Sequence, residues 1–147
     1  ERLNALDVPG VVLFNRFYEP DIDTEKIDFT AAEIFSSPED LRYSLRWVGI
    51  VSSKVQRIDI AASTGVHSGD AVVKQLLAGA TAVQICSAVY KKGFVQIKNI
   101  LEEMKGWMET HAYDQIDQFR GKLSYKNLQD PLIYERSQFM RYFSSIQ

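Results

Sequence analysis

The sequence is poor in cysteine and proline and has no long hydrophobic run. Its single cysteine, Cys86, excludes an internal disulfide and favours a reducing, cytoplasmic location. No apolar stretch approaches the roughly 20 residues that a membrane-spanning helix needs, so we expect no membrane as partner. The N-terminal residues lack the apolar core of a signal peptide. They also lack an initiating methionine, and we expect that the chain begins partway through a longer protein.

The sequence also lacks an excess of charge of either sign, since 17 Lys and Arg against 19 Asp and Glu give a net charge of -2. So small a net charge gives no reason to expect nucleic acid or an anionic membrane as a partner. The 46% hydrophobic and 24% charged content is ordinary for one soluble globular unit of 147 residues. Composition alone therefore leaves the function open.

Short apolar strands alternate with amphipathic helices along the chain. The periodicity predicts strands at residues 8–14, 58–61 and 81–85, and helices at about 37–51, 68–78 and 94–110. Ser37 is expected to cap the first helix, with Asp40 in the capping-box position. Ser68 caps the second helix, and Gly79 ends it in the C′ position, where a left-handed conformation costs glycine little. A short helical turn before Gly121 and a last helix from Asp130 complete the expected order.

Residues 16–36 interrupt this alternation and are expected to form a long, lid-like excursion. Its aromatic residues are expected to form the small core of the lid, or else to line a substrate pocket: Phe17, Tyr18, Phe29 and Phe35. Its three carboxylates, Asp21, Asp23 and Asp28, lack the glycine and the terminal glutamate spacing of an EF-hand. A solvated loop is therefore preferred to a metal site.

The order of the elements predicts an α/β fold with parallel strands joined by right-handed crossovers. Parallel sheets are covered on both faces or closed into barrels. Three strands would leave two sheet edges that nothing in this sequence protects. A piece of a larger α/β protein is therefore the better interpretation, and we expect the strands to be parallel neighbours in the order in which they occur.

Two successive strands end in groups of small residues, at 62–65 and at Cys86-Ser87-Ala88. In an eight-stranded βα barrel, the loops after strands 7 and 8 commonly build a phosphate site with a helix N-terminus. Backbone N–H groups donate to the phosphate oxygens, and small residues let the backbone approach closely. The alternative is two tight turns whose small residues merely allow the helices to dock. The spacing alone favours neither.

The amino-acid sequence of this region resembles the C-terminal part of the dihydroorotate dehydrogenase family. The segments that carry the resemblance are Ser63-Thr64-Gly65, LLAGA at 76–80, QICSA at 84–88 and AYDQIDQFRGKL at 112–123. The resemblance covers most of residues 8–125. The stretch VLFNRFYEPDID at 12–23 and the terminal segment at 127–147 resemble sequences of a divergent branch of the family.

The resemblance implies that residues 1–125 are about strands 6 to 8 of an FMN-binding (β/α)8 TIM barrel, followed by a helical extension at 126–147. It implies that the backbone around Ser63, Thr64, Gly65, Cys86 and Ser87 holds the FMN phosphate. It implies further that Asn15 faces the substrate, dihydroorotate or a related compound. The family's catalytic base and its flavin-contacting lysine belong to the N-terminal half of the barrel, which is the expected partner of this chain; a homodimer is a further possibility.

Several residues depart from the family pattern or have a simpler explanation. Arg16 follows Asn15, where the family commonly has serine or threonine, which leaves the substrate open. Thr64 and Cys86 stand where glycine is usual, although each still has a backbone N–H to offer. Cys86 is more easily explained as a small packing residue than as a nucleophile. His67 is either a phosphate contact or, more commonly for such a position, a solvated residue at a helix start.

Three functions follow from these observations. The first is an FMN-dependent oxidoreductase that oxidises dihydroorotate to orotate in pyrimidine biosynthesis, with this chain silent by itself. The second is an FMN barrel enzyme with another substrate. The third is a non-catalytic fragment that binds phosphate or flavin. Flavin absorbance separates the third from the others, and reduction of the flavin by dihydroorotate separates the first from the second.

Overall fold

The computed structural model describes residues 2–15, 19–31, 33–55 and 57–135 of the chain. Its centre is a three-stranded sheet with the order β1-β4-β5, formed by Gly10–Leu13, Asp59–Ala62 and Ala82–Val83. Both pairings are parallel, with Val11 opposite Ile60 and Ala62 opposite Val83. The predicted order and direction of the three strands are therefore confirmed. Within the described residues, no helix is long and apolar enough to cross a membrane.

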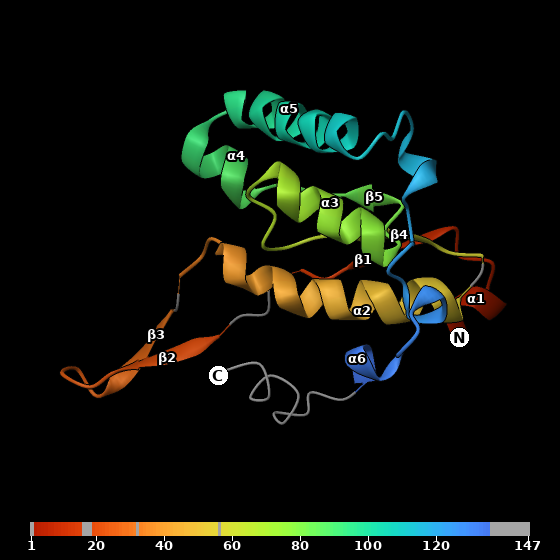
Figure 1. Cartoon of the computed structure of the whole chain (residues 1–147). Helices are drawn as coiled ribbons and strands as arrows, with labels where there is room; N and C mark the ends of the chain where they lie inside the picture. The colour runs from red at the N-terminus through yellow and green to blue at the C-terminus, as the bar shows by residue number, and fades with distance from the viewer. Residues whose placement is uncertain (1, 16–18, 32, 56, 136–147) are drawn as a thin grey trace, which may run out of the picture.

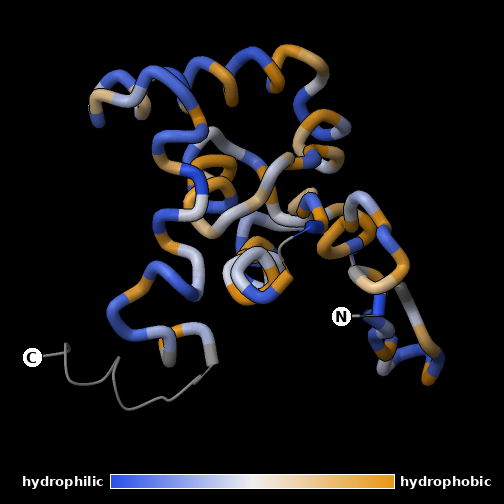
Figure 2. Tube along the Cα trace, turned by 90° about the vertical axis from the view of Figure 1, so that its right-hand side faces the viewer, coloured by the Kyte–Doolittle hydropathy of each residue, from blue (hydrophilic) through white to orange (hydrophobic). Residues whose placement is uncertain are grey.

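Three long helices lie beside this sheet, as Figure 1 shows: α2 (Leu41–Lys54), α3 (Gly69–Ala78) and α5 (Val95–Thr110). Helix α2 packs on β4 and on α3, and α5 packs on the far side of α3. Hydrophobic and hydrophilic residues alternate along α5, at the top of the molecule in Figure 2. The predicted helix at 94–110 is confirmed, although only Gln96 and Ile100 of α5 are buried.

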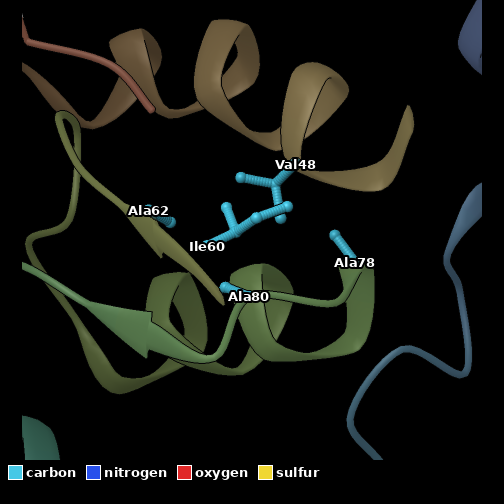
Figure 3. Close-up of a cluster of buried hydrophobic side chains, with 5 residues drawn as sticks. All are labelled: Val48, Ile60, Ala62, Ala78 and Ala80. Atoms are coloured by element: carbon cyan, nitrogen blue, oxygen red, sulfur yellow. The ribbon is translucent and has the colours of Figure 1, made fainter. Parts of the chain in front are cut away.

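The core lies between α2 and the outer face of the sheet. Figure 3 shows Val48 of α2 packed over Ile60 and Ala62 of β4, with Ala78 and Ala80 beside them. Side chains alternate between the two faces of a strand, so every second residue of β1 and β4 points to the face opposite the core. That second face is open among the described residues, and Val12 of β1 is 46% exposed there. A parallel sheet covered on one face is the arrangement expected of part of a barrel.

Local sequence signals place the helix ends where they were expected. The Ser37 amide donates to Asp40 Oδ2 at 2.8 Å, before a short 3-10 turn η1 (Pro38–Asp40) that leads into α2. The Ser68 hydroxyl accepts from the Ala71 amide at 3.2 Å, and Gly79 adopts a φ of 113° at the end of α3. These capping predictions are confirmed.

Several short elements were not predicted, and one strand is shorter than predicted. Strand β5 has two residues instead of the five at 81–85, although the Gln84 amide still donates to Ala62 O of β4 at 2.8 Å. A six-residue helix α4 (Ser87–Lys92) follows it, too short for a helical period to show in the sequence. The remaining short elements are α1 (Arg2–Ala5), η2 (Ile116–Gln118), η3 (Tyr125–Asn127) and α6 (Leu132–Glu135). The predicted helical extension at 126–147 lies outside the described residues beyond residue 135.

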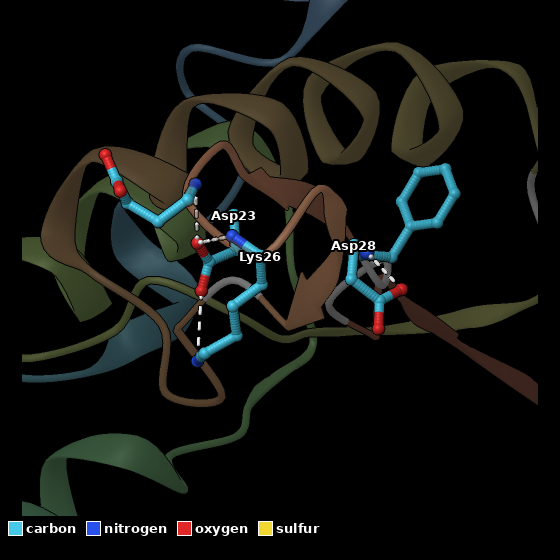
Figure 4. Close-up of polar contacts among 5 residues, drawn as sticks. Asp23, Lys26 and Asp28 are labelled. Carbon is cyan, nitrogen blue, oxygen red and sulfur yellow. Dashed lines mark hydrogen bonds and ion pairs between the residues drawn. The ribbon is translucent and has the colours of Figure 1, made fainter.

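The excursion contains an antiparallel hairpin formed by β2 (Pro20–Asp23) and β3 (Asp28–Ala31), which projects away from the helices in Figure 1. Figure 4 shows its turn, where Asp23 Oδ1 accepts from the Glu25 and Lys26 amides at 3.0 and 3.1 Å. The expected aromatic lid core is wrong for Phe29, which is 74% exposed. Phe35 instead packs against Tyr90 of α4, with ring centroids 4.4 Å apart and the rings tilted by 32°. Phe17 and Tyr18 lie outside the described residues.

Candidate functional site

The carboxyl ends of the three strands surround a cavity of about 190 Å³. The six residues to which the resemblance assigned a ligand contact all line this cavity: Asn15, Ser63, Thr64, Gly65, Cys86 and Ser87. The other lining residues are Ile34, Ser36, Val66 and Gln84. The small-residue turns that are 20 residues apart in sequence therefore meet at one place.

Strands β1 and β4 are joined at this edge by bonds between distant residues. The Ser63 amide donates to Leu13 O at 2.8 Å, and the Thr64 hydroxyl donates to Phe14 O at 2.7 Å. Thr64 has a φ of 76°, which is unusual for a β-branched residue and costs about 1–2 kcal/mol. This conformation is the one that glycine adopts freely, and the Oγ–carbonyl bond offsets part of its cost.

Gly65 follows with a φ of 77°, and its neighbour is the start of α2. A Cβ built on Gly65 would lie 2.6 Å from Leu41 Cα and 2.8 Å from the Asp40 carbonyl carbon. The sequence explained this glycine by the close approach of a ligand. The structure adds that the backbone of α2 already occupies the position of any side chain there.

Four backbone amides at the cavity are available to a ligand. Within the part of the chain that the structure describes, the N–H groups of Thr64, Gly65, Cys86 and Ser87 donate to no other group of the protein. Gly65 is buried and Thr64 and Ser87 are half-buried, and amides in such positions normally have partners. A cavity lined by such donors and by hydroxyl groups suits a ligand rich in hydrogen-bond acceptors, such as a phosphate.

Cys86 and Ser87 differ from what the sequence suggested. Cys86 is exposed and lines the cavity at the residue before α4, so the expectation of a small packing residue is wrong. The Ser87 hydroxyl accepts from the Ser36 amide at 2.9 Å and so ties the end of the excursion to α4.

Ser36 and His67 are the residues of this site that sequence reasoning missed or misplaced. Ser36 is buried and lines the cavity, and its Oγ lies 3.3 Å from His67 Nε2. The solvated position expected for His67 is wrong, because the ring is half-buried and burial lowers its pKa below the ordinary value. No local signal marks Ser36, since its partners lie 31 and 51 residues away.

A second cavity of about 240 Å³ adjoins the first and shares Asn15 and Thr64 with it. Its remaining lining residues are Phe14, Glu19, Asp40, Tyr43 and Ser44. Asn15 thus stands between a small polar cavity and a larger one that carries two carboxylates. Arg16, whose role the sequence left open, lies outside the described residues.

A parallel α/β sheet with a cavity at the carboxyl ends of its strands is characteristic of barrels and open α/β folds. Among the described residues the long helices lie on one face of the sheet, and this arrangement defines the chain as part of an α/β barrel. The chain belongs to the dihydroorotate dehydrogenase family, whose model, described as "Dihydroorotate dehydrogenase", matches residues 6–108.

Curated relatives match a shorter stretch. The chain is 39% identical over 67 residues to the dihydroorotate dehydrogenase (fumarate) of Saccharomyces cerevisiae, and 36% identical over 67 residues to that of Lachancea kluyveri. In both comparisons the match covers 46% of this chain and 21% of the relative. The matched stretch is thus about a fifth of the length of these relatives.

Solved structures extend the similarity to most of the chain at the level of fold. Dihydroorotate dehydrogenase (DHODH) from Eimeria tenella in complex with ferulenol superposes with a TM-score of 0.67 at 16% identity. The superposition covers 81% of this chain and 32% of that one. The ligand-free form gives a TM-score of 0.64 at 15% identity. The predicted α/β fold, the C-terminal part of a TIM barrel, is confirmed.

Proposed function

We propose that the full-length protein containing this chain is an FMN-dependent oxidoreductase that oxidises dihydroorotate to orotate. This chain supplies the half of the barrel that binds the FMN phosphate. The observation that carries the proposal is the meeting of two small-residue turns at one cavity, with four backbone amides free among the described residues. Membership in the dihydroorotate dehydrogenase family supplies the substrate.

The donors at the cavity fit the phosphate group of FMN. The amides of Thr64, Gly65, Cys86 and Ser87 would hold its oxygens, and Ser36 lines the same cavity. Hydrogen bonds to a charged acceptor are about twice as strong as neutral ones, so several such donors bind a phosphate without a lysine or arginine. When bound, FMN supplies a ring that accepts a hydride from the substrate.

Asn15 is the residue of this chain that would contact the substrate. It lines the larger cavity as well as the polar one, at the end of β1. Its side-chain amide offers both a donor and an acceptor, which matches the edge of a planar pyrimidine amide. Its part is to orient the substrate, since the expected catalytic base belongs to the other half of the barrel.

One observation favours a second candidate, an FMN barrel enzyme with a different substrate. Glu19 and Asp40 both line the cavity beside Asn15. Dihydroorotate is itself a carboxylate, and like charges at close range repel. A neutral dihydropyrimidine would not meet this repulsion.

Anaerobic reduction of the bound flavin tests the proposal. The purified full-length protein is expected to carry the absorbance of FMN and to lose it on mixing with dihydroorotate. Asn15→Ala should keep the flavin but slow its reduction by about 100-fold, because a misplaced substrate reacts poorly. Asn99→Ala, on the exposed surface of α5, is the matched control and should reduce at the normal rate.

The remaining outcomes decide between the candidates. Bleaching by dihydrouracil but not by dihydroorotate would establish the second candidate. A protein that binds FMN but is reduced by neither compound would contradict both enzyme functions. A protein without flavin would contradict the FMN site itself.

A further inference from the structure

Two hydrogen-bonding contacts with different parts of the chain hold Ser36 in the polar cavity. Its amide donates to the Ser87 hydroxyl of α4 at 2.9 Å, and its own hydroxyl lies 3.3 Å from His67 Nε2. Ser36 is 6% exposed and lines the cavity. His67 precedes α3, and its carbonyl accepts from Gln96 Nε2 of α5 at 3.0 Å. Contacts with α4, with α5 and between the two residues themselves therefore fix the positions of Ser36 and His67 at the cavity.

The hydroxyl of Ser36 has one proton, and His67 decides where that proton points. If Nε2 is unprotonated, it accepts the hydroxyl proton, and only the oxygen lone pairs are left for a ligand. If Nε2 carries a proton, it donates to the Ser36 oxygen, and the hydroxyl proton is free for an acceptor in the cavity. An anion in the cavity favours the second arrangement, which an imidazolium always provides.

The charges around His67 favour the neutral ring when the cavity holds no anion. Burial lowers the pKa of His67, and Lys91 and Lys92 of α4 lower it further. Contact with Ser36 and the carboxylate of Asp40 act in the opposite direction, and Glu39 of the same turn also faces the ring. On the α5 side, Glu103 is bonded to the Gly69 amide at 2.6 Å. A phosphate brings negative charge to the lysine side and would reverse the balance.

We propose that Ser36 and His67 make the polar cavity a proton-coupled phosphate site. The Ser36 hydroxyl donates to the bound phosphate, and His67 takes up a proton from solvent when the phosphate binds. This inference rests on the proposed function, since the phosphate is that of FMN. It assigns a ligand contact to Ser36 and a positioning role to His67, which acts through Ser36.

The test is a comparison of FMN with riboflavin, which has the same ring but no phosphate. In the full-length protein, the pKa of His67 is measured by NMR without flavin, with riboflavin and with FMN, and His67→Gln assigns the signal. We expect FMN to raise the pKa of His67 and riboflavin to leave it unchanged. His111, which stacks on Trp107 at the far end of α5, is the internal control and should not respond to either compound.

Two variants connect this change to affinity. Ser36→Ala should weaken FMN binding about tenfold and riboflavin binding not at all, because one hydrogen bond to a charged group is lost. Ser53→Ala, near the C-terminal end of α2, is the matched control and should bind FMN and riboflavin normally. His67→Gln keeps a donor but cannot titrate. The ratio of wild-type to His67→Gln affinity for FMN should therefore fall as the pH rises from the lowered pKa of His67 in the free protein to its raised pKa in the FMN complex.

The outcomes separate this inference from the proposed function. Normal FMN binding with an unchanged pKa of His67 would overturn the proton coupling and leave the FMN site intact. Normal FMN binding by Ser36→Ala would overturn the ligand contact. Failure of the wild-type protein to bind FMN, as judged by flavin fluorescence, would overturn the proposed function and this inference with it.

Discussion

The polar cavity and the β2–β3 hairpin are held together in opposite ways. Bonds at the cavity join residues that are far apart in sequence, such as Thr64 to Phe14 and Ser36 to Ser87. At the hairpin turn, Asp23 bonds to residues two and three positions further along the chain. The cavity therefore depends on the whole fold, whereas the hairpin turn forms from its own sequence.

The two regions also differ in what they expose. The cavity is lined mainly by small and polar residues that pack against the ends of the strands. The hairpin exposes large apolar side chains, with Ile27 89% and Phe29 74% exposed. A region with few buried contacts opens at little cost in free energy. Changes at the cavity should accordingly alter the stability of the whole protein, and changes in the hairpin should not.

The largest effect is expected at Gly65. Gly65→Ala should lower the free energy of unfolding by about 3 kcal/mol or more, because the new Cβ would overlap the backbone of α2. Gly93→Ala is the matched control: Gly93 has a φ of 76° but nothing within 4 Å of the added Cβ. Its cost should be the backbone term alone, about 1–3 kcal/mol. Urea unfolding of both variants measures the difference, and equal losses would contradict the close packing at Gly65.

A smaller effect is expected from the hydroxyl of Thr64. Thr64→Val keeps the shape of the side chain but removes its bond to Phe14 O, so the free energy of unfolding should fall by about 1 kcal/mol. The control is Thr110→Val, which removes a bond to Gly106 O within the exposed end of α5. A loss at Thr110 as large as that at Thr64 would remove the distinction between distant and local bonds.

The pH dependence of stability should show the half-buried position of His67. Burial lowers the pKa of His67 in the folded state, so the unfolded state binds its proton more readily. The contribution to stability is present above the unfolded pKa of about 6.5 and is lost as the pH falls through the lower, folded value. Unfolding midpoints measured from pH 8 to pH 5 should fall more steeply for the wild type than for His67→Gln. Parallel curves would mean that the ring is as solvated as the sequence suggested.

The smallest effect is expected at the hairpin. Asp23→Ala removes the acceptor of the Glu25 and Lys26 amides and the 3.1 Å ion pair with Lys26. The global unfolding midpoint should not change, while hydrogen exchange at these two amides should accelerate. A lowered midpoint would show that the hairpin contributes to the fold as the cavity does.

The sequence predicted the parts of the fold that local chemistry decides. Hydrophobic periodicity located the three parallel strands and the long helices, and capping residues such as Ser68 and Gly79 located their ends. Pairing order followed from the rule that parallel strands joined by helices are neighbours. The convergence of Thr64 and Cys86 on one cavity followed from the same rule, because the carboxyl ends of parallel strands share one edge.

The parts that depend on distant contacts could not be predicted in this way. Ser36 enters the cavity because Ser87 and His67 hold it there, and neither partner is near it in sequence. Cys86 is exposed at the residue before α4, a helix that the sequence did not predict. Phe29 is exposed because the hairpin projects from the molecule, although its composition favoured a small core.

A crystal structure of the full-length protein with FMN tests the central claim most directly. The account predicts that the FMN phosphate lies in the cavity at the ends of β4 and β5, with its oxygens about 3 Å from the amides of Thr64, Gly65, Cys86 and Ser87. It also predicts Asn15 beside the flavin ring. A phosphate bound elsewhere, with these four amides turned to solvent, would contradict the assignment of the site.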